Sequence, residues 1–128
     1  MRSGAIHRRL APVLAVLTAS GLLAAAPVQA AEASALCPGR KARTLPFSTG
    51  SVHVYKRGDH VCAVTLARNG GVKRQMSVSV QARGGRPVVD EGRFAHHAGP
   101  VTVHVGRRCV WVRGRVGADS VSSGWILC

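Results

Sequence analysis

Histidines are the residues of this chain best suited to chemistry, because imidazole is the commonest metal ligand in proteins. The chain has six: His7 lies near the N-terminus, His96 and His97 are adjacent, and His53, His60 and His104 are widely spaced. Neighbouring residues of an extended chain point to opposite faces, so at most one of the adjacent pair can face a given partner. No carboxylate lies at the HExxH spacing of zinc proteases. We therefore expect no metal site and no cofactor, and we place the pair in a loop that leads into a strand over 101–105.

Carboxylates and serines are the other candidates for acid–base or nucleophilic catalysis. The adjacent Asp90 and Glu91 precede a glycine, a pattern more typical of a solvated turn than of an acid–base pair. Three serines fall in a stretch rich in glycine and serine that lacks the G-x-S-x-G pattern of a serine nucleophile: Ser120, Ser122 and Ser123. We therefore expect no catalytic residues and a protein that is not an enzyme.

The N-terminus predicts export from the cell. Arginines at positions 2, 8 and 9 precede an apolar run rich in alanine, leucine and valine, which ends at a V-Q-A tripeptide over 28–30. This is the pattern of a secretory signal peptide over 1–30, with cleavage after Ala30. A retained membrane anchor is the alternative, but the run is short for a bilayer span and contains proline and glycine. We expect a secreted protein with no transmembrane segment once the signal is removed.

Four cysteines follow the predicted signal peptide, and none lies within it: Cys37, Cys62, Cys109 and Cys128. An even number in a small exported chain indicates two disulfides. The spacings of 25, 47 and 19 residues include no CxxC pair, which disfavours zinc. Three pairings are possible. We favour Cys37–Cys62 with Cys109–Cys128, each of which closes a loop of about 20–26 residues and stabilises the fold by roughly 3 kcal/mol.

The remaining chain alternates apolar and polar residues with a period of two, as β-strands with one buried and one wet face do. Such runs cover 52–55, 62–66, 76–81, 101–105, 109–113 and 125–128. Glycine-rich turns separate them, and no stretch after residue 30 shows helical periodicity. The pattern predicts an all-β domain over 51–128, a small antiparallel sandwich or barrel of about five to seven strands, preceded by an irregular N-terminal arm over 31–50.

The segment DEGRFAHHAGPVTVHV over 90–105, followed by RCVWVRGRV and the closing SGWILC, resembles the spore-associated protein A family of streptomycetes. That family carries a D-x-G-x-[FY]-x-x-[YH]-AGPV-x-V segment, then a cysteine strand, then a tryptophan near a terminal cysteine. VCAVTL and MSVSVQ are similar to two of its earlier strands, so the resemblance covers about residues 50–128 with the four cysteines. It implies a small exported protein of the cell or spore surface, without an assigned catalytic activity. This chain has arginine and histidine where the family usually has tyrosine or asparagine.

Arginine dominates the charge of the chain. The formal net charge is +13, and removal of the three signal-peptide arginines leaves +10 on the remaining 98 residues. Guanidinium groups form forked bonds to phosphate and carboxylate. The candidates for an anion-binding surface lie in neighbouring turns or on and beside one strand: Arg83, Arg86, Arg93, Arg107, Arg108, Arg113 and Arg115. An arginine-rich composition without a binding function is the alternative explanation.

The aromatic residues are few. We expect Trp111 and Trp125 in the core beside the last two cysteines, whereas exposed tryptophans would indicate a platform for carbohydrate or for a hydrophobic surface. Sequence-specific nucleic-acid binding, which needs aromatics among the charges, is not expected. We predict a secreted, surface-associated protein whose arginines bind anionic cell-envelope polymers. The alternative is a secreted cationic effector, either a hydrolase inhibitor that acts through a loop over 83–97 or an antimicrobial.

Overall fold

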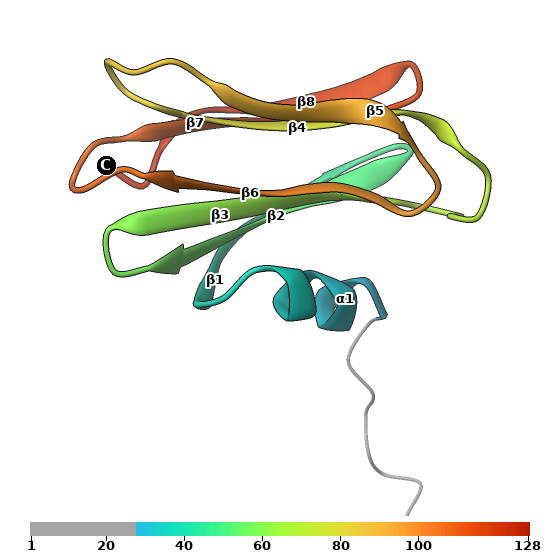
Figure 1. Ribbon diagram of the computed structural model, residues 1–128, viewed down its shortest axis with the longest axis horizontal. Coiled ribbons are helices and arrows are strands. Elements are labelled where there is room, and N and C mark those ends of the chain that lie inside the picture. Colours follow the sequence, from blue (N-terminus) through green and yellow to red (C-terminus); the bar gives the residue numbers. More distant parts are fainter. Residues whose placement is uncertain (1–27) are drawn as a thin grey trace, which may run out of the picture.

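The computed structural model describes residues 28–128, so nearly all of the predicted signal peptide lies outside the described residues. In this range the chain forms one helix and eight strands, and the strands make two four-stranded antiparallel sheets packed face to face (Figure 1). The predicted antiparallel β-fold with two disulfides is confirmed. None of the helical structure within 28–128 is long and apolar enough to cross a membrane.

The first sheet has the strand order β1-β2-β3-β6 and the second has the order β5-β4-β7-β8. The strands of the first sheet are β1 (Arg40–Phe47), β2 (Gly50–Arg57), β3 (His60–Ala67) and β6 (His97–His104). Those of the second are β4 (Arg74–Ala82), β5 (Val88–Phe94), β7 (Val110–Val116) and β8 (Asp119–Ile126). β1 and β5 coincide with no predicted run, and β8 begins well before the run predicted at 125–128.

Valine fills the space between the two sheets. The inward positions of the strands are mostly valine, with alanines and Met76 among them, and they form one buried cluster that includes Val52, Val54, Val78, Val80, Val112 and Val116. Branched side chains of this kind pack well on a pleated surface. A Cβ at Gly114 of β7 would collide with Val52, so the glycine allows β7 to approach β2 closely.

A helix covers the outer face of the first sheet. α1 (Val28–Leu36) lies on the side turned away from the second sheet, and it packs against β3 (Figure 1). The Cys37–Cys62 disulfide fastens the end of this helix to β3. A second apolar cluster, separate from the core between the sheets, lies beneath the helix and comprises Ala33, Cys37, Tyr55, Cys62, Val64 and Leu66.

Two expectations about this layer are wrong. The range 31–50, expected to be irregular, contains most of α1 and all of β1. The alternation in β2 does not leave one wet face, because α1 covers the first sheet and buries Ser51, His53 and Tyr55. Alanine favours helix without an apolar stripe, and β1 tolerates its proline because it is an edge strand, so neither element shows the usual periodicity.

The favoured disulfide pairing is confirmed. Cys37 pairs with Cys62 and Cys109 pairs with Cys128, and none of the four cysteines is free. The second bond joins the residue before β7 to the last residue of the chain, so the C-terminal end is held against the start of β7. Disulfides of this kind are compatible with an extracellular protein.

Candidate anion-binding surface

The structure distributes the histidines over three places. The adjacent pair lies where β5 passes into β6, and His97 Nδ1 is 3.5 Å from Glu32 Oε2 of α1. His53 is buried under α1. His60 and His104 face each other across β3 and β6, with ring centroids 5.1 Å apart. Within residues 28–128, no group of three or more histidine, cysteine or acidic side chains is placed to hold a metal ion.

The carboxylates and serines considered for catalysis lie in strands rather than in turns. Asp90 and Glu91 belong to β5, and the Asp90 carboxylate accepts a 2.7 Å hydrogen bond from the Gly99 N–H of β6. The three serines belong to β8, where Ser123 Oγ accepts a 2.9 Å hydrogen bond from the Val112 N–H of β7. Asp90 therefore joins edge strands of the two different sheets, and Ser123 joins two neighbouring strands of the second sheet.

A serine–histidine pair that the sequence analysis missed lies under α1. Ser51 Oγ is 3.0 Å from His53 Nε2 and 3.4 Å from the Gln29 Oε1 of the helix. Burial, reinforced by the positive charge of Lys41, lowers the pKa of His53 to about 4. The two side chains are only 5% and 4% exposed, so substrate cannot reach them in this structure. Residues two apart on a strand share a face, so the spacing of Ser51 and His53 in the sequence indicated that their side chains could meet.

Three turns and the start of β1 meet at one end of the sandwich, which we call the basic end. The N–H groups of Val105 and Gly106, between β6 and β7, donate to the Asp59 carbonyl between β2 and β3. The Arg83 N–H, between β4 and β5, donates 2.9 Å to the Cys109 carbonyl. These bonds bring together basic side chains that are distant in sequence: Arg40, Lys56, Arg57, Arg83, Arg86, Arg107 and Arg108.

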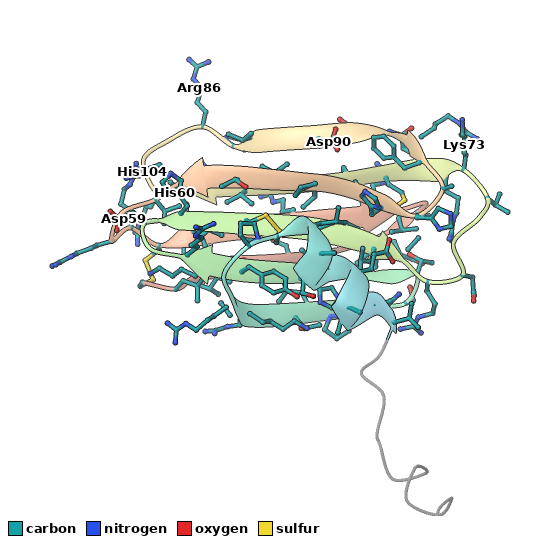
Figure 2. The ribbon with its side chains drawn as sticks, turned by 60° about the horizontal axis from the view of Figure 1, so that its bottom comes forward. Asp59, His60, Lys73, Arg86, Asp90 and His104 are labelled. Atoms are coloured by element: carbon teal, nitrogen blue, oxygen red, sulfur yellow. A yellow bond between two sulfur atoms is a disulfide. The ribbon has the colours of Figure 1, made fainter. Side chains whose placement is uncertain are left out.

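Negative charge is scarce at the basic end. Asp59 lies there beside His60 and His104, and its carboxylate is 4.0 Å from His104 Nε2. The C-terminus also lies at this end (Figure 1). Figure 2 shows Arg86 extending away from the sandwich here, whereas Lys73 stands at the opposite end. Asp59 is thus the one acidic side chain in these three turns and the start of β1, against seven basic side chains.

A hollow in the basic end adds residues that the sequence analysis did not select. It is lined by Gly39, Arg40, Lys56, Arg57 and Gly58. Arg40 and Lys56 are cross-strand partners in β1 and β2. Like charges directly opposite each other disfavour the folded sheet. An anion bound between them would relieve that repulsion.

The outer face of the second sheet carries the two tryptophans, and we call it the tryptophan face. Trp111 and Trp125 are cross-strand partners whose rings meet edge to face at 5.2 Å. Arg113 lies over the ring of Trp111 and Arg83 over that of Trp125, each 5.4 Å from the ring centroid. Trp125 remains 38% exposed. The expectation that both tryptophans are core residues is wrong, because the inward positions of β7 belong to valines one residue away.

A shallow hollow adjoins the tryptophans on the same face. Serine hydroxyls and arginine side chains line it, namely those of Ser77, Ser120, Ser122, Arg113 and Arg115, around the backbone of Gly114 and Val121. Ser122 Oγ accepts a 2.6 Å hydrogen bond from the indole N–H of Trp111, which joins the hollow to the ring pair.

The seven predicted arginines are all exposed and form two neighbouring groups. Arg83, Arg86, Arg107 and Arg108 lie in the turns of the basic end. Arg113 and Arg115 lie on the tryptophan face, and Arg93 lies on the outer side of β5 in the same sheet. Arg83 belongs to both surfaces, because its backbone is in a turn and its guanidinium lies over Trp125.

Comparison of the chain with models of known protein families, with curated proteins and with solved structures found no match. The resemblance to the spore-associated family therefore stays a prediction.

Proposed function

We propose that this is a secreted, non-enzymatic protein that adheres to anionic polymers of the cell or spore surface through its basic end. The observation that carries the proposal is the convergence of seven basic side chains, six of them exposed, at one end of the sandwich. Such a surface creates a field that attracts polyanions and is screened by salt.

A high net charge could produce adhesion without a dedicated surface. The test must therefore compare charges at the basic end with charges elsewhere. Arg57→Gln, Arg86→Gln and Arg107→Gln together remove three charges from the basic end. Their side chains make no hydrogen bonds within the described residues, so the fold should tolerate the change. Arg43→Gln, Arg68→Gln and Lys73→Gln remove three exposed charges elsewhere and are the matched control.

The measurement is the dissociation constant for purified teichoic acid at two salt concentrations. We expect the basic-end variant to bind about tenfold more weakly at low salt, with a shallower dependence on salt, because fewer counterions are released. The control variant should lose much less of its affinity for teichoic acid. Equal losses in the two variants would show that net charge, and not the basic end, determines adhesion.

The alternative of a secreted hydrolase inhibitor has less support from the geometry. The loop expected over 83–97 contains β5 at Val88–Phe94, which pairs with β4. The remaining turn between β4 and β5 is short.

A further inference from the structure

The tryptophan face offers more than positive charge, and we propose that it is a binding site for an acidic polysaccharide. A sugar ring would pack on the exposed indole of Trp125, and its carboxylate or phosphate would bind in the adjacent serine–arginine hollow. This inference rests on the proposed function, because it names the chemical class of the anionic polymer.

The register of the second sheet places the required groups in rows. Trp111, Arg113 and Arg115 point outward from β7, and residues two apart on a strand are separated by about 6.6 Å. Their cross-strand neighbours on β4 and β8 are mostly serines: Ser79 and Ser122 beside Arg113, and Ser77 and Ser120 beside Arg115. An aromatic ring and two cations therefore follow each other along β7, over about 13 Å from Trp111 to Arg115. Serine hydroxyls lie beside the two cations on the neighbouring strands β4 and β8.

A sugar fits this combination better than a bare polyanion does. One side of a pyranose ring presents C–H groups, which pack favourably on the negative face of an aromatic ring. Its hydroxyls need partners of the kind that serine and arginine provide. Polyphosphate would use the arginines, but it has no apolar surface to pack against the part of Trp125 that Arg83 and Trp111 leave exposed.

Nucleic acid is the less suitable ligand for this face. Proteins that bind single strands stack successive bases on aromatic side chains distributed along the groove. Here the two tryptophans contact each other edge to face, so they form one aromatic position rather than a series.

Binding of short ligands to the purified protein tests the inference. The probes are oligogalacturonate, a phosphorylated oligomannoside, the carboxyl-reduced neutral form of the first, inorganic polyphosphate and oligodeoxythymidine. The variants are Trp125→Ala and Arg115→Gln, and Trp125→Phe retains an aromatic ring in case the alanine variant unfolds. Arg43→Gln, which removes one exposed charge from β1 of the other sheet, is the matched control.

We expect at least one acidic oligosaccharide to bind, the neutral form to bind more weakly, and Trp125→Ala and Arg115→Gln each to weaken binding about tenfold. Trp125→Phe and Arg43→Gln should retain most of the affinity for the acidic oligosaccharide. Polyphosphate binding should not depend on Trp125. The glycan inference fails if Trp125→Ala binds the acidic sugars as tightly as the unchanged protein does. It also fails if the affinity for oligodeoxythymidine depends on Trp125 more strongly than the affinity for the acidic sugars does. In both cases adhesion through the basic end stands. If no polyanion binds at low salt, both proposals fail.

Discussion

His53 is buried, although the alternation of the sequence places it on the polar face of a strand. α1 buries it beside Ser51, and its Nδ1 has no hydrogen-bond partner among the described residues. Burial, together with Lys41, lowers its pKa to about 4. A charged imidazole at this position would be poorly solvated, so the folded chain resists protonation there.

The lowered pKa predicts that the fold loses stability in weak acid. An unfolded chain protonates this histidine near pH 6.5, whereas the folded chain does so near pH 4. The stabilisation is therefore fully present above about pH 6.5, and it is lost as the pH falls toward 4 because the unfolded chain binds more protons. The total over this interval is about 3 kcal/mol.

Denaturant unfolding at several pH values measures this effect. His53→Gln keeps a polar group beside Ser51 but cannot be protonated, so its free energy of unfolding should vary much less between pH 7 and pH 4.5. Parallel pH profiles for the two proteins would show that His53 does not contribute.

At the scale of the elements, the strands that could be predicted were those whose two faces differ in polarity. The valine alternation indicates β2, β4 and β7 because one side of each strand enters the core. β1 and β5 are edge strands with more exposed residues, so their sequences carry little alternation. α1 was missed because its alanine-rich sequence has no apolar stripe, and only Ala33 of the helix is buried.

The close approach of β7 to β2 predicts a sharp cost for a single methyl group. Gly114→Ala places a Cβ against the buried side chains of Val52 and Thr65, which must shift, and we expect a loss of about 1–3 kcal/mol in the free energy of unfolding. Gly92→Ala in β5 is the control, because the atoms nearest to its Cβ would be those of the Phe94 ring, at 3.0 Å or more. Similar costs for the two variants would contradict a special contact at Gly114.

The Cys37–Cys62 disulfide is expected to hold α1 on the first sheet. Replacement of both cysteines by alanine should lower the free energy of unfolding by about 3 kcal/mol and remove amide-exchange protection from the helix. Cys109→Ala with Cys128→Ala should cost a similar amount but leave the helix protected. Retained protection of α1 in the first variant would mean that packing alone holds it.

At the scale of the whole molecule, the distribution of charge predicts how the protein associates with surfaces. Adhesion through exposed arginines is electrostatic and is screened within a few ångströms at high salt. We expect a wash with about 1 M salt to release most of the surface-bound protein from intact cells, since the Debye length is then roughly 3 Å. A bound fraction that does not change in this wash would contradict an arginine-based mechanism.

The sequence by itself determined the broad class of this protein. Valine alternation and glycine turns predicted a β-domain, and the cysteine count predicted two disulfides whose favoured pairing the structure confirms. These features are local, because strand periodicity and loop length can be read along a single segment of chain.

Only the tertiary structure decided which side chains act together. The basic end depends on three turns that meet because of the strand order, and Arg40 and Lys56 join it although nothing in their local sequence distinguishes them. Register placed Trp111 opposite Trp125 on the outer face, and the covering helix turned His53 into a buried residue. A sequence states which residues alternate, but the packing of layers determines which of the two faces meets water.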